Sequence, residues 1–293
     1  MRARPALAGV CPVGGETLRR ARLRGASERR LSDILPPPGA PTAGFADLAA
    51  LRAAVGAGVD PVLYRAWRDI LPPRRKTSDQ AFTGDADFWY ADLVVYSPGV
   101  LPDGQLTRST GHWNSPAQLE IFQALAGTTL ILTAHCDSGK NAVEYQVCHP
   151  GDLAVIPFGA WHVTFCLDGP AAVFNVYTDD HQLSGDSSRV HAINPVSKYH
   201  QKPGPEIAVI NTAAGCEVVP TADPAPVAKP VAGPRPWTAA LLPAGSDLAG
   251  LFVNGSDANL AAILRRAHDS AERRKNLAPA IGLGTSPFTP GTR

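Results

Sequence analysis

The 293-residue chain has no long hydrophobic run, no strong excess of charge of either sign and few cysteines. No stretch of about 18 or more apolar residues is present, so we expect no membrane partner. The formal net charge of +1 argues against a dedicated nucleic-acid-binding protein, which is normally basic. The five cysteines form no CxxC pair and are odd in number, which favours free thiols in a reducing, cytoplasmic location over a secreted disulfide framework.

Proline and glycine are abundant instead, with 28 and 27 copies, and their distribution divides the chain into four parts. These are a flexible Arg- and Pro-rich arm, a main domain, a Pro-rich linker and a helical extension, over residues 1–44, 45–212, 213–236 and 237–293. Apolar residues at helical spacing predict a short helix over residues 45–57. A second helix is predicted from Ser256 to about Lys275, and its apolar stripe must dock on the main domain or on a second copy of the chain.

Short strands dominate the predicted main domain. Residues 88–96 are aromatic and β-branched, and five further segments of this kind lie between residues 128 and 178, separated by turn residues. The connections are too short for crossover helices, which disfavours a doubly wound parallel sheet. The sequence therefore predicts a mainly β fold, an antiparallel β-barrel (jelly roll) with flanking helices.

Candidate metal ligands lie within the predicted strands. His112 and His162 offer imidazole nitrogens, and Glu120 offers a carboxylate. Asn114 lies on the same strand face as His112, because side chains alternate along a strand, and its amide oxygen is a weak fourth ligand. Two imidazoles and a carboxylate suit a divalent transition metal that also binds substrate. From spacing alone, ordinary strand histidines and a solvated glutamate remain an alternative.

A second candidate cluster directly precedes His112. Ser109 and Thr110 offer hydroxyls, Gly111 offers a backbone N–H, and Arg108 offers a guanidinium. Such donors suit a phosphate group. Arg108 fits equally well as a solvated surface charge.

The clearest motif lies between Gly151 and His162. Its sequence, GDLAVIPFGAWH, fits the pattern G-x5-P-x-G-x2-H, which is the second motif of the cupin superfamily. Every fixed position matches, whereas the asparagine that customarily follows is absent, and Cys166 lies near its place. Over this segment the chain resembles the cupins.

The first motif resembles that of one cupin branch, the cupin-type phosphoglucose isomerases. In that family T-x-G-H-x-H is followed by E-V-Y and then by a glycine. The corresponding segments here are STGHWN, EIF and a glycine, at residues 109–114, 120–122 and 127. Two more segments, LYRAWRDI and FNVY at residues 63–70 and 174–177, extend the resemblance over about residues 60–180.

This resemblance implies a cupin-type barrel that holds a divalent metal ion (Fe, Mn, Zn or Ni), acts on a small-molecule substrate and forms a homodimer. The implied metal ligands are His112, Asn114, Glu120 and His162. The implied catalytic residues are Glu120 and Tyr177. The implied substrate contacts are Gln105, Arg108, Ser109, Thr110, Gly111 and His181.

Departures from the family pattern concern the pocket. Asn114 stands where the family has its second histidine, Phe122 where it has a tyrosine, and Gln105 where it has a glutamate. The family's His-Asp-Tyr segment after Tyr177 is not found, although His181 lies close to its place. Such changes favour a different substrate or a lost reaction.

Three functions follow as hypotheses. The first is a metal-dependent isomerase or epimerase acting on a small polar, sugar-phosphate-like or hydroxy-carbonyl substrate. The second is a cupin oxygenase of specialised metabolism, because two histidines and one carboxylate with open metal positions permit O2 chemistry. The third is a non-catalytic binding or scaffold protein in which the metal site has decayed, a reading that Asn114 and Phe122 favour.

Overall fold

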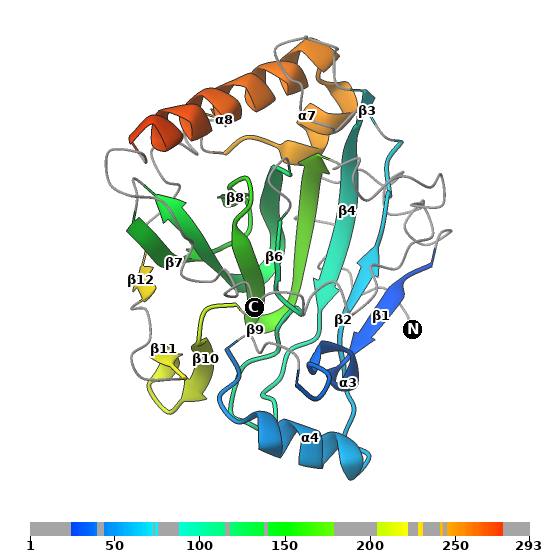
Figure 1. Ribbon diagram of the computed structural model, residues 1–293. Helices are drawn as coiled ribbons and strands as arrows, with labels where there is room; N and C mark the ends of the chain where they lie inside the picture. Colours follow the sequence, from blue (N-terminus) through cyan, green and yellow to red (C-terminus); the bar gives the residue numbers. More distant parts are fainter. Residues whose placement is uncertain are drawn as a thin grey trace.

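The computed structural model describes a mainly antiparallel β protein (Figure 1). The described residues are 25–39, 44–72, 74–75, 88–114, 118–137, 140–178, 204–221, 228–230, 241–242 and 245–277. Their strands form one 10-stranded sheet and one two-stranded hairpin. No helix among them is long and apolar enough to cross a lipid bilayer.

The large sheet follows one main path of strands. In spatial order these are β1 (Ser27–Arg30), β2 (Val62–Trp67), β4 (Phe88–Tyr96), β9 (Trp161–Thr178), β6 (Glu120–Asp137), β7 (Lys140–Cys148) and β12 (Ala228–Pro230). Three short strands pair beside this path, β3 (Arg74–Arg75) with β4, β5 (His112–Trp113) with β9 and β8 (Leu153–Ile156) with β6. The separate hairpin consists of β10 (Ile207–Thr212) and β11 (Gly215–Pro220).

Every strand pair is antiparallel except β12 with β7, so the predicted fold class is confirmed. Within the described residues the sheet remains open between its edge strands β1 and β12 and does not close into a barrel. The strand predicted over residues 88–96 coincides with β4. Of the five segments predicted as strands after residue 128, the second and third correspond to β7 and β8. The first is the C-terminal half of the 18-residue β6, and the last two merge into the 18-residue β9.

These two long strands bend near their middle. The pairing of β6 with β9 shifts in register at three places between Ala124 and Thr129. Gly127 lies in this bend with a φ of +67°, and a Cβ atom there would come within 2.8 Å of the Cα atom of Ala171. Only glycine fits here, because it has no Cβ atom and therefore tolerates both the left-handed backbone conformation and the close neighbouring strand.

The sheet has an apolar outer face that the C-terminal helices cover. Alternate residues of β4 and β9, such as Trp89, Leu93 and Phe174, share one buried cluster with residues of α7 (Leu248–Asn254) and α8 (Asp257–Leu277). Hydrogen bonds hold the start of α7 to β6, because Gln123 accepts from the Leu248 N–H at 3.0 Å and donates to the Ser246 carbonyl at 2.9 Å. The predicted second helix therefore docks on the sheet of its own chain.

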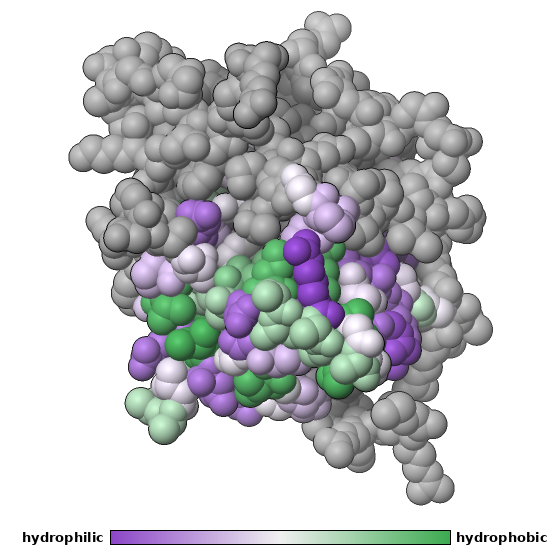
Figure 2. Space-filling view, turned by 60° about the horizontal axis from the view of Figure 1, so that its bottom comes forward, coloured by the Kyte–Doolittle hydropathy of each residue, from purple (hydrophilic) through white to green (hydrophobic). Residues whose placement is uncertain are grey.

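Both predicted helices are present at nearly the predicted positions. Ser256 accepts a hydrogen bond from the backbone N–H of Asn259 at 3.2 Å and so caps α8, as its position predicts. At the other end of the molecule lies α4 (Leu48–Gly56) (Figure 1). Asp47 caps its N-terminus by accepting a hydrogen bond from the backbone N–H of Ala50 at 2.9 Å. Seen from this end, the described surface mixes apolar and polar residues (Figure 2).

Two segments predicted to lie outside the domain belong to the fold. The arm predicted over residues 1–44 contains β1, which pairs with β2, and α3 (Leu31–Ile34), whose Leu31 and Ile34 are fully buried. Residues 27–34 of the predicted arm are thus part of the fold, held by strand pairing and by two buried apolar side chains. The linker predicted over residues 213–236 contains β11 and β12, which pair with β10 and β7.

We predict that Gly127→Ala destabilises the protein by more than about 2 kcal/mol, because it adds a steric clash to left-handed backbone strain. Gly169→Ala is the matched control: Gly169 also has a positive φ, +55°, but a Cβ atom there meets nothing within 4 Å. Strain alone should cost Gly169→Ala about 1 kcal/mol. Urea unfolding midpoints compare the two variants, and equal losses would show that the close approach at the bend is unimportant.

Candidate metal centre

Two histidines meet because their strands are direct neighbours. His112 of β5 lies opposite His162 of β9, so both side chains stand on one face of the sheet. Their ring centroids are 4.4 Å apart. The preceding Gly111 allows this approach, since its φ is +74° and a Cβ atom there would lie 2.8 Å from the indole ring of Trp161.

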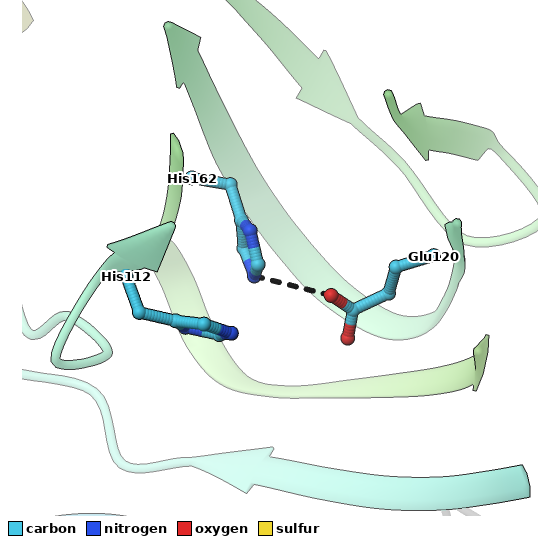
Figure 3. A group of neighbouring side chains, drawn as sticks. All are labelled: His112, Glu120 and His162. Carbon is cyan, nitrogen blue, oxygen red and sulfur yellow. Dashed lines mark ion pairs between the residues drawn. The ribbon is translucent and has the colours of Figure 1, made fainter. Parts of the chain in front are cut away.

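Glu120, the first residue of β6, completes the group (Figure 3). One ligand-capable atom from each of His112, Glu120 and His162 lies within 4.8 Å of the others. His162 Nε2 and Glu120 Oε2 lie 3.4 Å apart. In tetrahedral coordination two atoms bound to one ion at about 2.1 Å lie about 3.4 Å apart, so side-chain shifts of about 1 Å would bring all three atoms to one metal ion.

Burial sets the protonation of this group. It lowers the pKa of His162 to about 3, so the imidazole is neutral and its lone pair is available to a metal. Burial also raises the pKa of Glu120 to about 7. The hydrogen bond that Asn175 donates to Glu120 Oε1 at 2.7 Å opposes this rise, as does the positive charge of Arg68.

Several buried polar atoms here lack a hydrogen bond within the described part of the chain. They include Glu120 Oε2 and His162 Nδ1, together with both amide atoms of Asn114, which is 4% exposed. The Asn114 amide also acts to lower the pKa of Glu120, although less than Asn175 and Arg68 do. Buried polar atoms without partners are costly, and a bound cation would satisfy the carboxylate oxygen. The donor set of nitrogen and oxygen atoms fits a divalent transition metal.

The group faces a small polar cavity of about 60 Å³. His112, Glu120 and His162 line it together with the segment 109–111 that was predicted to contact substrate. The hydroxyls of Tyr64 and Thr110 lie 3.2 Å apart at this cavity. A volume of this size holds a few water molecules, so the part of a ligand that reaches the histidines is small.

Arg108 does not line the cavity, contrary to its predicted role as a phosphate contact. Its side chain is fully buried, with the guanidinium carbon 4.8 Å from the ring centre of Phe45 and 5.2 Å from that of Phe165. It donates to the Gly44 carbonyl at 2.7 Å. The alternative of a solvated charge is also wrong; Arg108 instead supports the packing beneath residues 109–111.

Two further predicted residues, Gln105 and Tyr177, do not line the cavity. Gln105 is buried outside the cavity and donates to Asp103 at 2.6 Å. Tyr177 lies opposite Glu120 in the sheet, but its ring stacks on Tyr90 at 5.8 Å between centroids and does not line the cavity. His181 lies outside the described residues.

Several residues that line the cavity were not predicted from the sequence. Tyr64, Arg68, Tyr96 and Asn175 all line the cavity, and burial raises the pKa of Tyr96 above its usual range. A signal existed for most of them, since LYRAWRDI and FNVY carried the family resemblance. A buried residue beside the cavity, Asp92, also had a signal in the sequence, because it is the charged residue in the otherwise apolar or aromatic segment FWYADLVVY.

Comparisons with known proteins give only partial likenesses. No family model and no curated protein match the sequence. Among solved structures, recombinant oxalate oxidase in complex with glycolate is 20% identical, with 31% of this chain and 42% of that chain covered at a TM-score of 0.26. KdgF from Halomonas sp. is 16% identical over 39% of this chain and 79% of that chain, with a TM-score of 0.25.

Oxalate decarboxylase from Bacillus subtilis is 18% identical over 40% of this chain and 26% of that chain, at a TM-score of 0.27. The match thus spans less than half the length of both the oxalate oxidase and the decarboxylase.

We predict that Glu120→Gln stabilises the metal-free protein more at pH 8 than at pH 5. Folding raises the pKa of Glu120 from 4.5 to about 7, so the ionised form costs stability as the pH rises through this range. The gain at pH 8 should reach up to about 3 kcal/mol, the value of such a pKa shift. Urea unfolding in the presence of a chelator measures it.

Glu217→Gln, at an exposed position of β11, is the matched control and should have no such pH-dependent effect. A Glu120→Gln variant whose stability relative to wild type is equal at both pH values would contradict the prediction.

Proposed function

We propose that this chain is a metal-dependent enzyme of the cupin type, an isomerase or epimerase acting on a small polar hydroxy-carbonyl substrate. The observation that carries the proposal is the convergence of His112, Glu120 and His162 on one polar cavity. Motif resemblance supports it, because the same three residues occupy the metal positions of the two cupin motifs.

A divalent metal held by His112, Glu120 and His162 would supply Lewis-acid stabilisation of negative charge on neighbouring carbonyl and hydroxyl oxygens. The hydroxyls of Ser109 and Thr110 line the same cavity and can orient a polar ligand. Glu120 supplies either a ligand to the metal or the base that moves a proton between adjacent carbons, but not both at one moment.

Asn114 decides how strongly metal is held. Imidazole is a better ligand than an amide for zinc, iron or nickel, so we predict that Asn114→His tightens metal binding by about tenfold or more. His162→Ala should abolish stoichiometric metal, because His112 and Glu120 alone are too few strong donors. Metal content by mass spectrometry and competition with a chelating dye measure both effects.

His149→Ala, at an exposed turn position, is the matched control and should retain metal. If wild type binds no metal under any loading condition, the centre has decayed and the binding or scaffold function replaces the proposed one.

Isomerisation has a signature that does not require the substrate to be known beforehand. Proton transfer at the carbon next to a carbonyl group exchanges its hydrogen with solvent. We therefore predict that the metal-loaded protein catalyses incorporation of deuterium from D2O into the substrate at this carbon. A panel of small hydroxy-aldehydes, hydroxy-ketones and their phosphates, followed by proton NMR, tests this. His162→Ala should show no exchange above the metal-free background.

The oxygenase function rests on the same donor set, since two histidines and one carboxylate also suit non-haem iron. Oxygen consumption by the iron-loaded protein without deuterium exchange would favour it over the isomerase.

A further inference from the structure

A buried acidic residue lies next to the cavity, in a strand that is otherwise apolar or aromatic. Asp92 of β4 is fully buried, and its partner across the sheet is the cavity residue Asn175. A buried carboxylate is costly unless charges and hydrogen bonds compensate for it. Two groups do so: the backbone N–H of Asp69 donates to one oxygen at 2.8 Å, and the guanidinium of Arg68 pairs with the other.

The backbone after β2 is shaped for this contact. Asp69 has a φ of +48°, the one positive value among the described residues other than glycine. Non-glycine residues adopt this conformation with strain, which persists only where the surroundings compensate. Here the turn lets two consecutive residues, Arg68 and Asp69, both contact Asp92.

Asp92 thereby orients Arg68 towards the metal centre. The Arg68 side chain is 41% exposed and lines the same cavity as His112, Glu120 and Thr110. Among the residues known to line this cavity it is the cationic one, because Arg108 is buried behind it between two aromatic rings. A guanidinium held by a carboxylate on one side is preorganised to bind an oxyanion with its other donors.

Charge balance points the same way. With a divalent ion bound, as the proposed function requires, the cavity with Arg68, Asp92 and Glu120 carries one net positive charge. A low-dielectric site of this kind favours a ligand that brings a negative charge.

We propose that Arg68 is an oxyanion-binding residue of this site, that it takes a carboxylate or phosphate group of the ligand, and that Asp92 is its positioning residue. The anionic group then lies beside the metal centre, and Arg68 has the anion-binding role that the sequence assigned to Arg108. This narrows the proposed substrate class from polar hydroxy-carbonyl compounds to anionic ones.

Calorimetric titration of the metal-loaded and the metal-free protein tests this. The probes are lactate, inorganic phosphate and lactamide, the uncharged counterpart of lactate. Wild type should bind at least one of the two anions more tightly than lactamide, and the preferred anion identifies the group. Arg68→Gln should weaken anion binding about tenfold or more, and Arg68→Lys should lose less, since charge remains without the planar fork.

Arg65→Gln is the matched control, because Arg65 lies in β2, three residues before Arg68, but pairs with the exposed Glu28. It should bind the anions as wild type does. Unchanged anion affinity in Arg68→Gln overturns the proposal, as does a wild type that binds neither anion or prefers lactamide.

Asp92→Asn tests the positioning role. If Asp92 acts through Arg68, this variant weakens anion binding, whereas Arg68→Gln with Asp92→Asn is no weaker than Arg68→Gln alone. Additive losses overturn that role, and Arg68→Gln still tests the subsite if Asp92→Asn fails to fold. Metal content is measured in the same samples. Arg68-dependent anion binding by a protein that holds no metal supports the subsite and contradicts the proposed enzyme. Bound metal without Arg68-dependent anion binding rejects the subsite alone.

Discussion

The fold-back of the sheet at the bend of β6 and β9 is the constraint on which the candidate metal centre depends. Along the paired strands, Glu120 lies opposite Tyr177, whereas His162 lies opposite Thr133, 13 residues further along β6. In a flat sheet this separation would be about 43 Å. The two side chains nevertheless approach to 3.4 Å. The bulges around Gly127 thus bring opposite ends of the same strand pair together, and without them the ligands would never meet.

The ligand group could be read from sequence, but most of the cavity around it could not. His112 and His162 occupy motif positions, and Glu120 begins a strand-like segment shortly after the first motif, so local pattern was enough to predict the three residues as a group. Arg108 misled the prediction, because a cation next to a motif does not say which way its side chain turns. Its strand contact is a single bridge to Phe165, too short for alternation to predict a face.

Local sequence pattern was enough to predict individual helices and strands, but it did not predict which strands pair with one another. The strand of residues 88–96 and the helix after Ser256 needed only periodicity and a capping residue. In contrast, composition suggested an arm and a linker where β1 and β12 pair with the sheet. A few residues such as Leu31 are outweighed by the arginines and prolines around them, and their burial depends on partners far along the chain. The homodimer and the cytoplasmic location remain predictions.

The position of α7 and α8 has a consequence for synthesis on the ribosome. The outer face of β4 and β9 is complete by residue 178, but the described residues that cover it from the C-terminal side begin at Leu241. A growing chain therefore exposes Trp89 and Phe174 until α7 and α8 have been synthesised. Contacts so distant in sequence form slowly, and an uncovered apolar sheet promotes aggregation. Nascent chains of this protein are thus expected to depend on chaperones that shield apolar sheets until α8 has emerged from the ribosome.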